Sequence, residues 1–98
     1  MLYAVLFEDN PAAASDLRQQ HMAAHLSFLE NHAAQVKAAG PLQTSSKDPA
    51  GGLWIVEAAG PNIVDALVKA DPFWHTGLRS SVRVMQWSQV FAEGKRLL

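Results

Sequence analysis

The chain contains no cysteine among its 98 residues. That absence excludes disulfide bonds and thiolate metal ligands, and with no signal-peptide pattern at the amino terminus it predicts a cytoplasmic location. Long apolar runs are missing as well. The longest runs from Leu2 to Phe7, whereas a helix needs about 20 apolar residues to cross a bilayer. We therefore expect no membrane partner.

An excess of positive charge is also lacking. Eight Lys and Arg residues against nine Asp and Glu residues give a net charge of −1. The only basic cluster consists of Arg79, Arg83, Lys95 and Arg96, which is too little to predict a surface for a phosphate backbone. No basic strand carries the stacking aromatic residues of an RNA-binding sheet. We therefore expect no nucleic-acid partner.

What the chain does contain is ordinary globular chemistry. With 49% hydrophobic and 17% charged residues, residues 1–98 are predicted to form a single domain. A domain of this size buries only about two-thirds of the surface that its unfolded chain exposes, so a partner subunit would add considerable stability.

The first half of the chain predicts a strand and a long helix. Leu2 to Phe7 is apolar throughout and ends in a turn cluster, as a strand covered on both faces would. From about Ser15 to Ala39 the apolar residues recur three and four apart, which places on one helical face Met22, Leu26, Leu29, Ala33 and Val36. Gly40 and Pro41 are predicted to end this helix.

The second half predicts three further strands and a short helix. The predicted strands run from Pro41 to Ser46, from Leu53 to Ala58 and from Ser80 to Trp87, and a polar loop from Lys47 to Gly52 separates the first two. The predicted helix runs from Pro61 to Ala70, and its buried stripe consists of Ile63, Val64, Leu67 and Val68. The tail from Gln89 to Leu98 is too short to assign. The order favours an α+β fold, a ferredoxin-like βαββαβ plait whose four-stranded antiparallel sheet carries both helices on one face.

The apolar character of the first and third strands has a consequence for assembly. Helices on one face leave a sheet-sized apolar surface on the other. We therefore predict a homodimer in which two copies pack sheet against sheet, with a higher oligomer as a further arrangement.

His25 is the residue best placed for acid–base chemistry. It lies about 60° around the helix from Met22, at the boundary between core and cleft. An imidazole titrates near neutrality and acts as a proton carrier if a carboxylate fixes its tautomer. Asp71 could supply that carboxylate, or it could simply cap a short turn before Pro72, and both roles can coexist. The alternative is that His25 is a surface residue of the helix with no functional role.

Other site chemistries lack support. His21 and His25 are four residues apart, but no clear third metal ligand follows, so we expect no metal. No phosphate-binding loop or dinucleotide fingerprint is present, so we expect no cofactor. Aromatic residues that could wall a pocket, or equally form the core, are Phe7, Trp54, Phe73, Trp74 and Trp87.

Three short motifs stand in an unusual combination. They are Ala24-His25-Leu26-Ser27-Phe28-Leu29, Ala39-Gly40-Pro41-Leu42, and Ala70-Asp71-Pro72-Phe73 with Gly77 following. In this order the chain from Leu2 to about Trp87 resembles the YCII-related (YciI-like) family of the dimeric α+β barrel superfamily.

The resemblance implies a dimeric α+β barrel with a cleft that holds a His-Asp dyad, formed here by His25 and Asp71. Arg18 stands where members often carry an arginine, and Met22 stands where a second arginine is frequent. Arg18, Phe73 and Trp74 are accordingly expected to bind substrate. The family is linked to a dehydrochlorinase acting on chlorinated hydroxyquinols, and related barrels include muconolactone isomerase.

Two functions from different classes follow. The first is a cofactor-free lyase or isomerase in which His25 abstracts a proton from a small cyclic or aromatic compound while Asp71 steadies the imidazolium. The second is a non-catalytic small-molecule-binding or accessory dimeric domain. An enzyme requires His25 to be reachable and hydrogen-bonded to Asp71, directly or through water, whereas a binding module does not.

Overall fold

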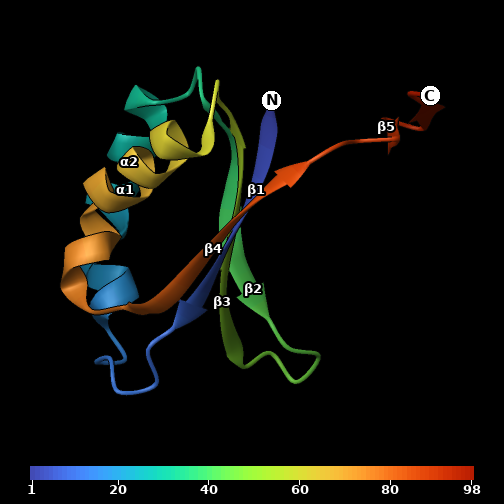
Figure 1. The fold of residues 1–98 in the computed structure, drawn as a ribbon. Helices are drawn as coiled ribbons and strands as arrows, with labels where there is room; N and C mark the ends of the chain where they lie inside the picture. Colours follow the sequence, from blue (N-terminus) through green and yellow to red (C-terminus); the bar gives the residue numbers. More distant parts are fainter.

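A four-stranded antiparallel sheet carries two helices on one of its faces (Figure 1). The computed structural model describes residues 1–98. In chain order the elements are β1 (Leu2–Asp9), α1 (Leu17–Asn31), β2 (Val36–Gln43), β3 (Pro49–Glu57), α2 (Pro61–Ala70), the 3-10 helix η1 (Pro72–Thr76), β4 (Arg79–Trp87), β5 (Phe91–Ala92) and β6 (Lys95–Arg96). This arrangement confirms the predicted ferredoxin-like α+β fold.

The core lies between the sheet and the helices. The strand order is β2-β3-β1-β4, so β1 has a neighbour on each side. Because side chains alternate along a strand, Tyr3, Val5 and Phe7 face the helices and are buried. Val5 lies opposite Trp54 of β3 and Val84 of β4, which joins the central three strands in one apolar layer.

The second helix has the predicted bounds. Pro61 stands in its first turn, where a missing N–H costs nothing. Val64, Leu67 and Val68 are buried against the sheet, as expected, but Ile63 is 39% exposed and lies outside that stripe. Neither α1 nor α2 is both long enough and apolar enough to cross a membrane.

The first helix is shorter than predicted. α1 ends at Asn31, not at Ala39, and after a turn the chain enters β2 at Val36. The backbone of residues 36–43 pairs with β3, so Val36 lies opposite Val56. Of the predicted helical stripe only Val36 lies in this strand, and its pairing with β3 overrides the local helical spacing.

Gly40 and Pro41 therefore do not end a helix. They lie inside β2, which forms one edge of the sheet and ends at Gln43, before the predicted Ser46. An edge strand tolerates proline because the nitrogen without a hydrogen can face away from the neighbouring strand.

The third strand begins earlier than predicted. It starts at Pro49, so Gly51 and Gly52 belong to β3 and not to the preceding loop. Gly51 has a φ of 118°, and a Cβ there would collide with the backbone oxygen of Phe7. Only glycine lets β1 and β3 approach at this point. The fourth strand, at Arg79–Trp87, agrees with the prediction to within one residue.

The sheet face away from the helices is apolar, as the sequence indicated. A shallow hollow on it is lined by Ala4, Leu53, Ile55, Met85, Gln86 and Trp87. Met85 and Trp87 are 40% and 41% exposed. This is the face on which we expect a second copy, and the homodimer stays a prediction.

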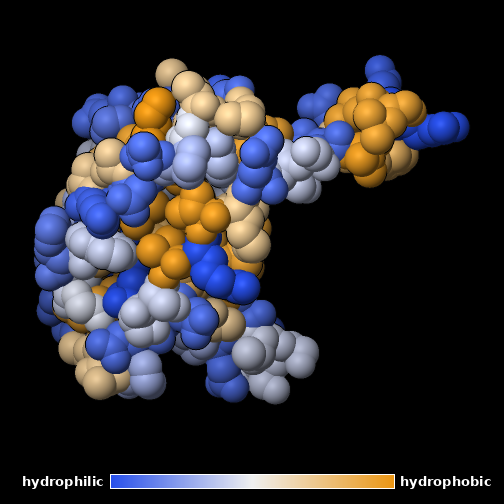
Figure 2. Space-filling view, in the orientation of Figure 1, coloured by the Kyte–Doolittle hydropathy of each residue, from blue (hydrophilic) through white to orange (hydrophobic).

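The tail forms a small arm. β5 and β6 pair with each other and lie away from the main sheet (Figure 1). Figure 2 shows apolar side chains gathered at the end of this arm. Val90, Phe91, Leu97 and Leu98 are all more than half exposed.

Candidate functional site

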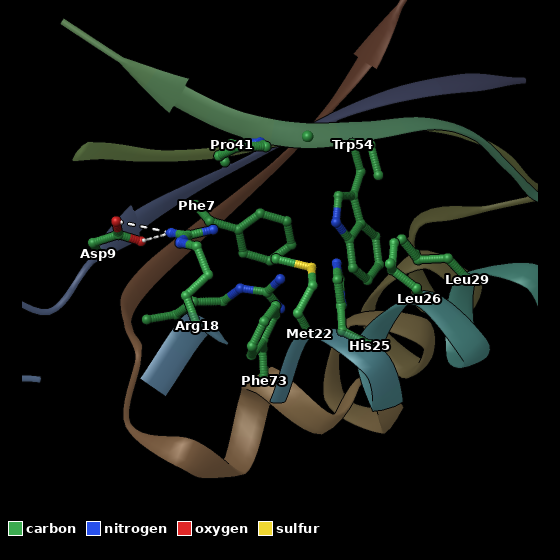
Figure 3. Close-up of a pocket in the computed structure, with 14 residues that line it drawn as sticks. Phe7, Asp9, Arg18, Met22, His25, Leu26, Leu29, Pro41, Trp54 and Phe73 are labelled. Carbon is green, nitrogen blue, oxygen red and sulfur yellow. Dashed lines mark hydrogen bonds and ion pairs between the residues drawn. The ribbon is translucent and has the colours of Figure 1, made fainter. Parts of the chain in front are cut away.

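A cavity of about 100 Å³ lies between α1 and the helix-bearing side of the sheet (Figure 3). Its polar lining consists of Asp9, Arg18, His25 and Arg79. Its aromatic walls are Phe7, Trp54 and Phe73, and the rest of the lining is Met22, Leu26, Leu29, Ala39, Gly40, Pro41 and Gly52. The misassigned Gly40-Pro41 step thus belongs to the cavity wall.

His25 is the one residue of α1 that is buried. The predicted stripe put Leu26 on the inner face, but Leu26 is 48% exposed. The helix is therefore turned so that His25 points into the cavity, towards Trp54 (Figure 3). The imidazole ring lies 4.4 Å from Phe73 and 6.3 Å from Trp54 between ring centroids.

Asp71 contacts the imidazole of His25 from outside the cavity lining. Oδ1 of Asp71 lies 2.8 Å from Nδ1 of His25 and also accepts a hydrogen bond of 3.2 Å from the backbone N–H of Phe73. Asp71 is fully buried and does not line the cavity. Both roles that the sequence left open are thus filled, since the same carboxylate caps η1 and contacts the imidazole.

Arg79 is a third member of this cluster that the sequence reasoning missed. Its Nη1 lies 2.8 Å from Oδ2 of Asp71, and its side chain is only 7% exposed. The guanidinium carbon lies 3.8 Å from the ring centroid of Phe7, within the range of a cation–π contact. The only signal in the sequence was membership of a small basic cluster, which did not distinguish Arg79 from Arg83.

The neighbours of Asp71 determine its charge state. Burial on its own would raise the pKa of the Asp71 carboxyl, but the hydrogen bond with His25 and the positive charge of Arg79 outweigh burial, so the pKa lies below its ordinary value. Burial lowers the pKa of the Arg79 guanidinium, and Asp71 opposes that shift. At neutral pH the pair is a buried carboxylate beside a buried guanidinium.

This arrangement fixes the tautomer of His25. A carboxylate can only accept, so Nδ1 of His25 carries the hydrogen. In the neutral ring Nε2 is then the nitrogen with a free lone pair, and the ring lines the cavity.

Arg18 lies at the opposite end of the lining from Trp54 (Figure 3). One of its terminal nitrogens donates to both carboxyl oxygens of Asp9, at 3.0 Å each. Its side chain is 30% exposed and lines the cavity.

The two aromatic residues predicted to bind substrate lie in different places. Phe73 is buried and lines the cavity. Trp74 is not part of the lining and packs against the hydrophobic core. No group of three or more His, Cys, Asp or Glu side chains is arranged to hold a metal ion.

Comparison with known proteins gives this geometry a context. A solved structure of 5-chloro-2-hydroxyhydroquinone dehydrochlorinase (TftG) from Burkholderia phenoliruptrix AC1100, in complex with 2,5-dihydroxybenzoquinone, is 32% identical in sequence with a TM-score of 0.77. The match covers 90% of this chain and 94% of that one. None of the curated proteins matches the chain. The family model described as the YCII-related domain matches residues 1–88, and the chain therefore belongs to the YCII-related family.

Proposed function

We propose that this protein is a cofactor-independent lyase or isomerase that abstracts a proton from a small cyclic or aromatic compound, with His25 as the base. The observation that carries the proposal is the hydrogen bond of 2.8 Å between Nδ1 of His25 and a buried Asp71, which directs the other imidazole nitrogen to an aromatic-walled cavity. The dehydrochlorinase activity of the 32%-identical relative supports this reaction class.

The step needs only one base and one anchor. Nε2 of His25 takes a proton from an acidic C–H or O–H of the ligand, and the electron pair left behind moves into the ring system. In a lyase this electron pair expels a leaving group such as chloride, so that a proton and chloride are lost together. In an isomerase the imidazolium returns its proton at another carbon.

Asp71 acts through His25 and is a positioning residue. It does not line the cavity, but its negative charge stabilises the imidazolium that forms when His25 accepts the proton. Phe73 and Arg18 line the cavity beside His25 and are the binding residues in this proposal. Trp74 packs against the hydrophobic core and is not a binding residue in this proposal.

Self-association is part of the same proposal. The apolar hollow around Ile55 and Met85 lies on the sheet face that no helix covers, and contiguous exposed apolar surface of this kind marks an interaction site. A second copy of the chain offers the same flat apolar face, so we propose a homodimer with its sheets packed against each other.

The test uses the compound named for the related enzyme. Purified protein is mixed under anaerobic conditions with 5-chloro-2-hydroxyhydroquinone, and chloride release is followed by ion chromatography while uptake of solvent deuterium into the ring is followed by NMR. His25→Asn keeps a donor towards Asp71 but removes the base, and should lower the rate roughly 100- to 10,000-fold. His21→Asn, on the same helix but outside the cavity lining, should keep the wild-type rate.

The two candidate functions give opposite results. Chloride release or deuterium uptake that depends on His25 supports the enzyme. Saturable binding of the compound without either signal would identify a small-molecule-binding module and reject the catalytic proposal.

A further inference from the structure

Arg79 is a buried cation whose hydrogen-bonding capacity the protein does not fill. A guanidinium has five N–H donors. The only polar partner of this side chain is Oδ2 of Asp71, at 2.8 Å from Nη1, and the two atoms meet as an ion pair without good hydrogen-bond geometry. Of the guanidinium nitrogens only Nη1 is fully buried without a hydrogen bond, and it faces Asp71, so the donors that remain for a ligand are those of Nε and Nη2. A ligand in the cavity that Arg79 lines is the available partner.

The aromatic walls determine how Arg79 presents its donors. Its guanidinium carbon lies 3.8 Å from the ring centre of Phe7, and 5.4 Å and 5.5 Å from those of Trp54 and Phe73. At 3.8 Å the guanidinium carbon lies over the face of the Phe7 ring, and the N–H groups lie in the plane of the guanidinium. Such an edge fits an oxygen of a planar ligand that lies in the same slot.

Two guanidinium groups line the cavity, and both are paired with carboxylates. Arg18 lines the same cavity, and its charge acts on Arg79. Each of the two guanidinium groups has one carboxylate neighbour, Asp9 for Arg18 and Asp71 for Arg79. These two ion pairs leave no excess of positive charge, so an anion would be held by the N–H donors of Arg79 and Arg18 that their carboxylate neighbours leave unused.

We infer that the cavity selects planar oxyanions, namely aromatic phenolates or carboxylates, and that Arg79 binds the charged oxygen. Insofar as this ligand is the substrate, the inference rests on the proposed function. Negative charge that develops on the ligand when His25 removes a proton would form beside Arg79. Asp71 contacts both side chains, one through each oxygen, and so keeps the base and the anion-binding group in a fixed relation.

The size of the cavity limits the ligand to about one ring. A cavity of roughly 150 Å³ is known to accept benzene, and the space beside His25 is about 100 Å³ and not fully enclosed. A monocyclic anion therefore matches the site better than a fused ring system.

The experiment measures binding directly, without turnover. Wild-type protein is titrated in a calorimeter with 4-nitrophenolate, with benzoate and with neutral nitrobenzene, at a pH where both acids are ionised. Arg79→Gln removes one positive charge from the cavity, and Arg96→Gln removes one from the exposed tail. We expect the anions to bind wild type more tightly than nitrobenzene. Arg79→Gln should weaken anion binding by about 10- to 100-fold and leave the affinity for nitrobenzene unchanged. Arg96→Gln should bind all three compounds with wild-type affinity.

Several outcomes would overturn the inference. One is that wild type binds nitrobenzene and the anions with equal affinity. Another is that Arg79→Gln binds the anions as tightly as wild type does. The more tightly bound anion identifies a phenolate or a carboxylate as the preferred group. If Arg79→Gln does not fold, Arg79→Lys keeps a charge beside Asp71 but lacks the planar edge. It should bind the anions about tenfold more weakly, and unchanged affinity would reject the role of Arg79.

Failure of this inference and failure of the proposed function look different. Anion binding that depends on Arg79, with no chloride release or deuterium uptake, leaves the inference standing and rejects the enzyme. Turnover that continues at the wild-type rate in Arg79→Gln supports the enzyme and rejects the inference. His25→Asn should retain anion binding in either case.

Discussion

Nη1 of Arg79 lies 2.8 Å from Oδ2 of Asp71, the carboxyl oxygen that His25 leaves free. The side chain of Asp71 is 0% exposed and that of Arg79 is 7% exposed, so both charged groups are shielded from solvent. Neither could be buried alone without a large loss of solvation. The stability of this pair and the orientation of His25 therefore depend on the same carboxylate.

Removing the charge of Asp71 should destabilise the protein strongly. Asp71→Asn leaves Arg79 buried without a counter-charge, and breaking a buried ion pair from one side costs about 3–5 kcal/mol. Urea unfolding followed by circular dichroism measures the change in the free energy of unfolding.

The double variant Asp71→Asn, Arg79→Gln is the control for that prediction. It removes both charges, so the penalty of an unpaired ion disappears and the variant should be more stable than Asp71→Asn alone. Strict additivity of the single changes would show that the two side chains are not energetically coupled.

The pKa of Asp71 predicts how stability changes in acid. Because the folded-state pKa lies below the ordinary 3.8, the unfolded chain binds this proton more readily than the folded protein does. The stability that the ionised Asp71 contributes is fully present at pH values above its ordinary pKa. It is lost as the pH falls through the pKa that Asp71 has in the folded protein. The groups that face Asp71 are His25 and Arg79. The free energy of unfolding of wild type minus that of the double variant, measured between about pH 5 and pH 3, should therefore decrease as the pH falls. An increase of this difference on acidification would contradict the linkage.

The uncovered sheet face predicts the state of association. Ile55→Lys places a charge in the apolar hollow of that face and should convert a wild-type dimer to a monomer at micromolar concentration, measured by sedimentation equilibrium. Ile63→Lys is the matched control, because Ile63 is a 39%-exposed residue of α2 outside this face. A wild-type protein that sediments as a monomer would reject the dimer.

The sequence predicted the order of elements well, and its errors have physical causes. The bounds of α2 followed from the Pro61 signal and a compact apolar stripe. α1 was extended too far because Ala33 and Val36 continue its spacing, although Val36 pairs with β3. No local pattern records a hydrogen bond to a distant strand, so the end of this helix depended on tertiary structure.

The candidate site was only partly predictable for a similar reason. His25 was identified from its place at the edge of the predicted helical stripe and Asp71 from its place before Pro72, and the resemblance of their short motifs to a family supported the pair. Arg79 was missed because β4 changes register between the partners of Glu8 and Asp9. Regular alternation would place Arg79 on the same side as Arg83, on the outer face. The bulge turns Arg79 to the inner side instead, and periodicity alone does not show such a shift.

Pro41 limits where the sheet can be extended. It lies in edge strand β2, and a proline there has no N–H to offer to a further strand. A further strand that paired with β2 would find no N–H donor at Pro41, which also lines the cavity. Pro41 therefore weakens edge-to-edge pairing along β2, in addition to lining the cavity.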